Sequence, residues 1–312
     1  MNMMKNGEKW LDVDGKPIEA HGGCRLNYGG KIYWYGEDRT GDNYVSCYEK
    51  TAKGWKFLNN VLTVNSPKQP TRVKSDLSLI TEVASGEKVH AIIERPKVLY
   101  CEKTGKFVMW MHYENGVDRK CARCAVATCD TPYGDFVYHG SFNPYGNDSR
   151  DCTLFKDGEK VYFFSSSRSN SDMHVYLLAD DYLNVNKFIG ALFSNEVREA
   201  PAIIKKNGKY LIVTSYCTGW KPNQSTFSVS DSIDGVFSVN QNLGDENTYF
   251  SQSAFLYENE QGDIVYFGDR WGGNDFNKTG VFDYTKSGYC AYKIEFDGKT
   301  ATLIPSEDAF NE

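Results

Sequence analysis

Three carboxylates and one carboxamide occupy matching places along the chain, each just ahead of a run of strand-forming residues. They are Glu94, Asp151, Glu199 and Gln252, and the fifth such place holds His21. Converging carboxylates suit cleavage of a glycosidic bond, because one carboxyl must stay protonated and give its proton to the leaving oxygen. Burial beside other carboxylates raises a pKa in that direction. The pattern therefore predicts a site for glycoside hydrolysis.

Glu199 is the best candidate for the proton donor, because the apolar residues 200–203 that follow it disfavour ionisation. Asp151 is its natural partner, which would orient the acid and couple to it electrostatically. The alternative for each is a solvated strand end in which the carboxylate pairs with the adjacent Arg198 or Arg150.

The elements that must position these residues form a repeat of about 50 residues built from strand signals alone. In each copy a tight turn precedes a run of aromatic and β-branched residues, and Asn-Gly or Asp-Gly at the turn favours a hairpin. The five runs are 30–35, 105–110, 160–164, 208–213 and 262–267. Such a repeat predicts an all-β, five-bladed β-propeller with four-stranded antiparallel blades, in which the five polar places meet at one central funnel.

The repeats account for nearly the whole chain of 312 residues, so we expect a single domain over residues 1–312. The longest irregular stretch, residues 67–90, predicts a functional or mobile loop between the first two blades. Residues 289–304 read as a further hairpin that completes an outer blade, and no segment has a helical period.

Composition narrows the function classes. A net charge of −6 with interspersed signs gives no electrostatic reason to expect nucleic acid or membrane as a partner. Nine cysteines, mostly in predicted strands, suit buried thiols, and the Cys121-x-x-Cys124 spacing without a second pair favours ordinary sheet residues over a metal site. The N-terminus lacks a signal peptide, so we expect a cytoplasmic protein, or a secreted one if a signal peptide has been removed.

Motifs in the same order along the chain resemble glycoside hydrolase family 43. The resemblance rests on the segments 19–23 (EAHGG), 33–37 (YWYGE), 94–97 (ERPK), 109–115 (MWMHYEN), 151–155 (DCTLF), 199–201 (EAP) and 268–271 (GDRW). Within the family the chain is most similar to the exo-β-1,3-galactanase branch, subfamily 24. The resemblance implies a five-bladed propeller that releases galactose from β-1,3-galactan, the backbone of arabinogalactan-proteins, with inversion.

The resemblance also implies catalytic roles. Asp151 matches the pKa-modulating aspartate and Glu199 the acid, whereas His21-Gly22-Gly23 stands where the family's usual base aspartate would be. The galactanase branch shares that loss and holds the nucleophilic water with a glutamine, a place that Gln252 occupies. An amide is a poor base, so Gln252 would act as its imidic-acid tautomer or only position the water. Glu94 could instead accept the proton or bind the sugar, and His21 is open as a base, as a packing residue or as support for a central cation.

Sugar binding requires flat apolar faces and partners for hydroxyl groups. Stacking is expected from four aromatic residues near the predicted funnel, and the resemblance alone adds three polar contacts. These residues are Trp110, Tyr113, Trp220 and Trp271, with Glu37, Asn170 and Thr218.

We expect no required cofactor and no carbohydrate-binding module. The sequence does not support the structural Ca²⁺ that many relatives carry in the central channel. The expected partner is an oligo- or polysaccharide, bound by a monomer. Two alternatives stay open: a related family 43 enzyme acting on other galactosides, galactofuranosides or arabinosides, and a sugar-binding pseudoenzyme.

Overall fold

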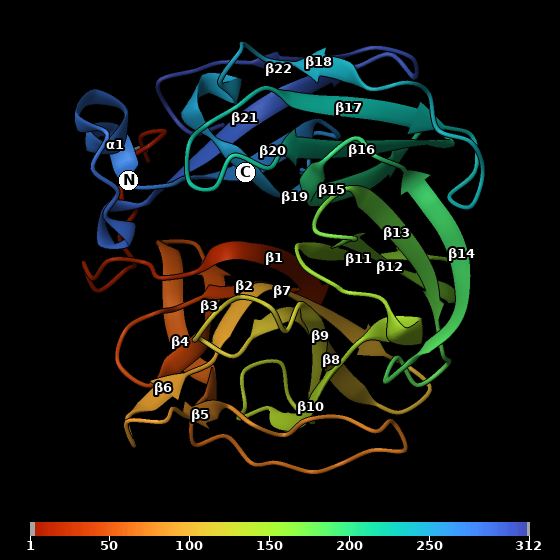
Figure 1. Cartoon of the computed structure of the whole chain (residues 1–312). Helices are drawn as coiled ribbons and strands as arrows, with labels where there is room; N and C mark the ends of the chain where they lie inside the picture. The colour runs from red at the N-terminus through yellow and green to blue at the C-terminus, as the bar shows by residue number, and fades with distance from the viewer. Residues whose placement is uncertain (1–3, 311–312) are drawn as a thin grey trace. The chain divides into compact units, whose positions relative to one another are not determined.

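The computed structural model describes residues 4–310, and its regular structure is almost entirely β-sheet (Figure 1). Five four-stranded antiparallel sheets follow one another along the chain, and in each sheet the strands pair in sequence order. These sheets are the blades of a β-propeller, so the predicted fold class is confirmed. The contact pattern divides the chain into unit 1, residues 1–18 and 197–312, and unit 2, residues 19–196. The expectation of a single domain stays a prediction.

Unit 2 contains blades 1, 2 and 3 and a short two-stranded sheet. Blade 1 comprises β1 (His21–Tyr28), β2 (Lys31–Glu37), β3 (Asn43–Thr51) and β4 (Gly54–Thr63). The short sheet comprises β5 (Ile80–Glu82) and β6 (Lys88–His90). Blade 2 comprises β7 (Ile92–Cys101), β8 (Lys106–Glu114), β9 (Arg123–Cys129) and β10 (Val137–Phe142). After the 3₁₀ turn η1 (Pro144–Gly146), blade 3 comprises β11 (Cys152–Asp157), β12 (Lys160–Ser167), β13 (Asp172–Leu178) and β14 (Val185–Phe193).

Unit 1 contains blades 4 and 5. Blade 4 comprises β15 (Arg198–Lys206), β16 (Lys209–Tyr216), β17 (Ser225–Ser230) and β18 (Gln241–Leu243). The 3₁₀ turn η2 (Thr248–Phe250) leads into blade 5, which comprises β19 (Gln252–Glu258), β20 (Ile264–Arg270), β21 (Gly288–Phe296) and β22 (Ala301–Ile304). Helix α1 (Gly273–Thr279) and the 3₁₀ turn η3 (Tyr284–Lys286) lie between β20 and β21.

Aromatic residues of the second strands form the blade cores. Trp34, Trp110 and Tyr266 are fully buried, because flat rings fill the space against neighbouring strands. The hairpin expected over residues 289–304 is confirmed as β21 and β22.

Two expectations need correction. The stretch 67–90 contains the β5–β6 hairpin, so it is not wholly irregular. Helix α1 has seven residues, although no helix was expected, because its sequence GNDFNKT is too short and too polar to show an apolar stripe. No helix in the described part of the chain has the length and apolar character needed to cross a bilayer. All nine cysteines are free thiols.

A β-bulge interrupts the first strand just after the predicted site residue in three blades. Between one paired position and the next, the first strand advances by three residues while the second strand advances by two. This happens directly after His21, Glu94 and Glu199. The next residue is left-handed in each case, with φ of 57° at Gly22, 55° at Arg95 and 52° at Ala200. Bulges bend the strand and redirect side chains, so the backbone itself aims these three residues. A left-handed conformation is costly for Arg95 and Ala200, and such strain gathers at functional sites.

Candidate active site

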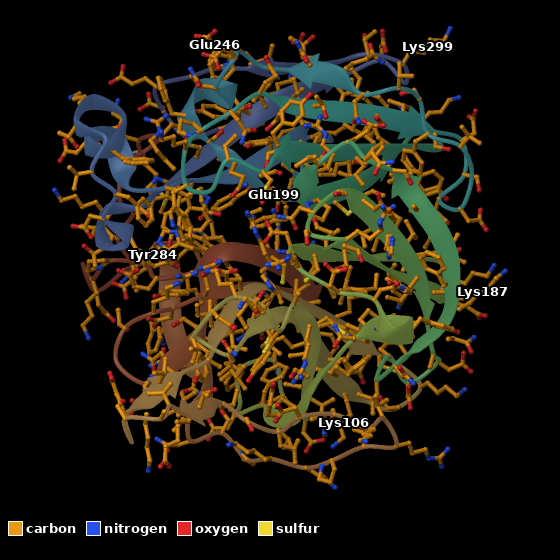
Figure 2. All side chains as sticks on the ribbon, viewed as in Figure 1. Lys106, Lys187, Glu199, Glu246, Tyr284 and Lys299 are labelled. Carbon is orange, nitrogen blue, oxygen red and sulfur yellow. The ribbon has the colours of Figure 1, made fainter. Side chains whose placement is uncertain are left out.

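Glu199 and Gln252, predicted to work together, are in direct contact in unit 1 (Figure 2 labels Glu199). The amide nitrogen of Gln252 donates to Glu199 Oε1 at 2.9 Å and to Ser215 Oγ at 2.9 Å. The amide oxygen of Gln252 accepts from the indole Nε1 of Trp271 at 2.8 Å. Because Trp271 can only donate, the amide can take only one orientation, with its nitrogen toward Glu199.

The rings of Trp220 and Trp271 form an aromatic wall beside the Gln252 amide. The Trp271 ring packs edge-to-face against Trp220, with centroids 5.1 Å apart. The Trp220 ring stacks on Phe282, at 4.5 Å and an interplanar angle of 9°. Phe282 comes from the segment that follows α1, so this inserted segment covers one face of Trp220.

A small hollow lies between the wall and the amide. Its lining includes Ser215, Trp220, Gln252, Asp269 and Trp271, and its volume is about 10 Å³. That is room for about one water molecule.

Unit 2 holds a charged cluster around Glu94 and Asp151. Glu94 Oε1 lies 2.7 Å from Arg39 Nη2 and 3.1 Å from Arg119 Nη2, and Glu94 Oε2 lies 3.1 Å from His112 Nδ1. Asp151 pairs with Arg95 Nε at 3.0 Å.

The second nitrogen of His112 is also occupied. Its Nε2 lies 3.2 Å from Glu114 Oε1, which in turn pairs with Arg150 Nη1 at 3.1 Å. The Arg150 side chain therefore pairs with Glu114, although the sequence had offered Asp151 as its neighbour.

The charges in this cluster shift the pKa values of its members in opposite directions. Burial lowers the pKa of His112, but hydrogen bonds with Glu114 and Glu94 outweigh it and raise that pKa to about 9. Burial favours the neutral form of Glu94, yet the contact with His112 and the charges of Arg39 and Arg119 hold its pKa well below the usual range. The cluster therefore carries an imidazolium beside an ionised carboxylate at neutral pH.

Glu37 has a different environment. Its carboxylate is 2% exposed and receives both Nε and Nη2 of Arg39, at 3.0 and 2.8 Å. Burial nevertheless raises the pKa of Glu37, and nearby Glu94 adds to the rise. Lys97, also buried, donates to the carbonyls of Gly22 and Gly23, and burial lowers its pKa to about 8.

Glu94, His112 and Asp151 are the one group of three potential metal ligands within residues 4–310, with their ligand atoms inside 4.8 Å. Ca²⁺ requires six to eight oxygen ligands, and this group offers two carboxylates and one ring nitrogen. Both carboxylates of the group are already paired with guanidinium groups. The residues present therefore do not fit a calcium ion.

The predicted stacking residues divide into two kinds. Trp220 and Trp271 form the aromatic wall, whereas Trp110 and Tyr113 are fully buried. Trp110 packs on Phe163 at 4.7 Å and donates its indole N–H to Tyr182 O at 2.7 Å. This corrects the expectation for Trp110 and Tyr113, because a ring enclosed in a blade core has no face for a sugar.

Three predicted residues remain: Asn170 and Thr218 lie in turns, and His21 begins a strand. Asn170 has φ of 67° in the turn between β12 and β13. Thr218 Oγ1 donates to Lys221 O at 2.6 Å in an exposed turn. His21 is fully buried at the start of β1.

Sequence reasoning named Glu37 but missed the other residues that face the predicted ones across the inner hairpins of blades 2, 4 and 5. The register pairs His21 with Glu37, Glu94 with His112, Glu199 with Ser215 and Gln252 with Asp269. A signal was available, because each partner follows the turn glycine by seven positions. The glycine–partner pairs are Gly30–Glu37, Gly105–His112, Gly208–Ser215 and Gly262–Asp269.

Comparisons with solved structures cover nearly the whole chain. An exo-β-1,3-galactanase from Clostridium thermocellum is 36% identical with a TM-score of 0.83, and the match covers 97% of this chain and 65% of that one. An exo-β-1,3-galactanase from Phanerochaete chrysosporium, solved with β-1,3-galactotriose, is 29% identical with a TM-score of 0.84, covering 100% and 69%. A family 43 β-1,3-galactosidase with galactodeoxynojirimycin is 29% identical with a TM-score of 0.82, covering 98% and 100%.

No curated protein sequence matches the chain. The family model for glycosyl hydrolases family 43 matches residues 96–270, which is more than half of the chain. The match includes Asp151, Glu199 and Gln252. The chain therefore belongs to glycosyl hydrolase family 43 and is a glycoside hydrolase.

Proposed function

We propose that this glycoside hydrolase is an exo-acting, inverting enzyme that releases galactose from β-1,3-galactan or arabinogalactan fragments. The observation that carries the proposal is the Trp271–Gln252–Glu199 hydrogen-bond chain, in a protein similar to exo-β-1,3-galactanases. Glu199 is the general acid, and Gln252 positions the attacking water.

The hydrogen bonds suit this division of roles. Glu199 Oε1 accepts from Gln252, so the amide holds the carboxyl group that carries the proton for the leaving oxygen. The Gln252 oxygen has a second lone pair beside the one that Trp271 uses, and it can accept a hydrogen from water. The hollow next to this amide has room for about one water molecule.

The contact distance sets a condition on the mechanism. Inverting glycosidases keep their acid and base carboxylates about 6.5–9.5 Å apart, so that the sugar and the water fit between them. Glu199 and Gln252 are 2.9 Å apart and in contact. In our proposal the sugar breaks this hydrogen bond on binding, which separates the acid from the amide and frees an amide hydrogen for the substrate.

For unit 2 we propose that Glu94 binds sugar hydroxyl groups and does not accept the proton. A carboxylate surrounded by Arg39, Arg119 and His112 is a weak base. It remains a good hydrogen-bond acceptor, and the guanidinium groups beside it donate to hydroxyls. Glu37, with a raised pKa, is a second acceptor in the same cluster.

The test is incubation with β-1,3-galactobiose while NMR follows the product anomer. Inversion predicts that α-galactose appears first. Glu199→Gln should lower kcat by about 10²–10⁴-fold on this substrate, and much less on an aryl galactoside whose leaving group needs no proton. Glu246→Gln, an exposed carboxylate of the same unit, is the matched control.

Other outcomes would reject the proposal. First release of β-galactose would exclude inversion. Cleavage of arabinosides or galactofuranosides in place of galactobiose would assign the related activity, and binding without cleavage would indicate a pseudoenzyme.

A further inference from the structure

Residues 67–78 form a strap over the outer edge of blade 2. At one end Pro67 O accepts from Tyr138 N at 2.7 Å, and Gln69 N donates to Tyr138 O at 3.0 Å. At the other end Asp76 and Ser141 exchange two backbone hydrogen bonds, of 2.9 and 2.8 Å. Between these anchors the strap leaves β10, so it is fixed at both ends and bowed in the middle.

The close approach of the strap is built into the strand. Gly140 in β10 has φ of 99°, and a Cβ there would lie 2.5 Å from Ser75 Oγ and 2.8 Å from Asp76 O. Only glycine allows this conformation and this contact.

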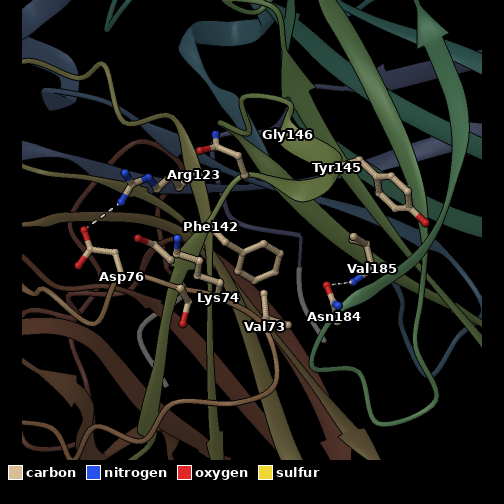
Figure 3. Close-up of a pocket in the computed structure, with 12 residues that line it drawn as sticks. Val73, Lys74, Asp76, Arg123, Phe142, Tyr145, Gly146, Asn184 and Val185 are labelled. Atoms are coloured by element: carbon tan, nitrogen blue, oxygen red, sulfur yellow. Dashed lines mark hydrogen bonds and ion pairs between the residues drawn. The ribbon is translucent and has the colours of Figure 1, made fainter.

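Residues 73–76 of the strap line one side of a hollow of about 690 Å³ (Figure 3). Asp76 and Arg123, paired at 3.0 Å, lie on one side, Tyr145 lies on the opposite side, and Phe142 lies between them (Figure 3). The volume falls within the range of about 300–1,000 Å³ that is typical of ligand sites. None of Glu199, Gln252, Glu94 and Asp151 lines it.

Tyr145 presents a fixed flat face at this hollow. It is 59% exposed, yet its ring stacks on Tyr176 at 6.3 Å and 18°, and its hydroxyl donates to Asn186 O at 2.8 Å. Its φ of 52° is a left-handed conformation, which is costly for an aromatic residue. An exposed ring that the fold holds rigid in a strained conformation indicates a binding platform.

The polar groups around this ring include several donors. Asn184 uses its Oδ1 to accept from Val185 N at 2.8 Å, which leaves its Nδ2 to donate. Arg123 has donors beyond the one that holds Asp76, and Lys74 is exposed on the strap. One flat aromatic face with several donors suits a ligand that has an apolar ring face and many hydroxyl and ether oxygens.

We propose that this hollow is a second, non-catalytic carbohydrate site that holds a β-1,3-galacto-oligosaccharide; the choice of sugar rests on the proposed function. A second hollow of about 770 Å³ shares Val73 and Asn184 with it and continues beneath residues 69–73 of the strap. The two together offer a path for more than one sugar unit. A second site raises the effective concentration of a polymeric substrate without any change in the chemistry.

The test is calorimetric titration of β-1,3-galactotriose into the Glu199→Gln protein, which does not consume the ligand. Two binding events per chain are expected. Adding Tyr145→Asn, which removes the ring but tolerates a left-handed φ, should weaken one of them about tenfold. Tyr133→Ala, which removes an exposed tyrosine that does not line the hollow, is the matched control and should leave both events unchanged.

Kinetics give the second readout. In the otherwise native enzyme, Tyr145→Asn should leave kcat/KM on an aryl β-galactoside unchanged and raise KM on β-1,3-galactan. Lys74→Ala, an exposed substitution on the strap, should raise the same KM and serves if Tyr145→Asn does not fold.

A single binding event in Glu199→Gln, or two unchanged events after Tyr145→Asn, would overturn the inference while leaving the proposed function intact. If the native enzyme does not cleave galactobiose but Tyr145→Asn still weakens galactotriose binding, the proposed function fails and the second site stands.

Discussion

The indole N–H of Trp271 points at the amide oxygen of Gln252 from 2.8 Å, and this contact decides which end of the amide faces Glu199. Without it the amide could flip and present its oxygen to the Glu199 carboxylate. The two oxygens would then repel each other, or share the proton that the acid must deliver. Trp271 is therefore a positioning residue whose ring also belongs to the aromatic wall.

Trp271→Phe should lower kcat about tenfold, because it removes a hydrogen bond worth about 1 kcal/mol or more and leaves the amide unfixed. The ring and its packing on Trp220 remain, so KM should change less. Steady-state kinetics on galactobiose measures both parameters. Trp55→Phe, a buried tryptophan in blade 1, is the control, and an equal loss of kcat there would mean that the effect is only structural.

Gln252→Ala should lower kcat by about 10²-fold, because the attacking water loses the group that positions it. Glu94→Gln should mainly raise KM, since the neutral amide still contacts hydroxyl groups but no longer balances Arg39 and Arg119. Both variants are compared on the same substrate. If Gln252→Ala keeps full activity while Glu94→Gln abolishes it, Glu94 handles the water and our assignment is wrong.

Protonated His112 should make stability depend on pH. Its folded pKa of about 9 lies above the ordinary 6.5, so its contribution is complete below pH 6.5 and disappears as the pH rises through 9. A shift of this size corresponds to about 3 kcal/mol. The Glu94 contribution, with its pKa lowered, is present above its ordinary value of 4.5 and is lost only in stronger acid.

Thermal melting between pH 6 and 9.5 tests this dependence. The fall in Tm of the native protein should be much shallower in His112→Gln, and the difference between the two curves isolates His112 from other groups that titrate in the range. His90→Gln, an exposed histidine of unit 2, should keep the native slope. Parallel curves for the native protein and His112→Gln would contradict the prediction.

Gly23→Ala should destabilise blade 1 by more than about 3 kcal/mol. A Cβ at Gly23 would lie 1.8 Å from Tyr35 O, and the atom it meets is backbone that cannot rotate away. Gly29 in the neighbouring turn is left-handed with open space around it, so Gly29→Ala should cost only about 1 kcal/mol. Urea unfolding of both variants measures the difference, and similar costs would show that the bulge can move.

The blades could be predicted from the sequence because the residues that specify each hairpin lie close together in the chain. Turn glycines such as Gly208 and alternating aromatic residues specify each hairpin by themselves. The same signals placed Glu199 and Gln252 at the starts of β15 and β19. Trp110 was misjudged because a strand pattern shows which residues share a face, but not whether another layer covers that face.

The charge state of the cluster around Glu94 and Asp151 could not be predicted from the sequence, for a different reason. The raised pKa of His112 depends on Glu114, two residues away, and on Glu94, which reaches it through the β7–β8 register. The left-handed residues after Glu94 and Glu199 were also hidden, since arginine and alanine do not signal positive φ.

The bulge that aims Glu94 and the facing His112 both lie inside one hairpin of about twenty residues, and the same holds for Glu199 with Ser215. Each of these two hairpins is thus a self-contained unit that carries its functional side chain, the backbone geometry that directs it and its opposite neighbour. Recombination between related genes could exchange one such hairpin and alter one function while the others stay as inherited.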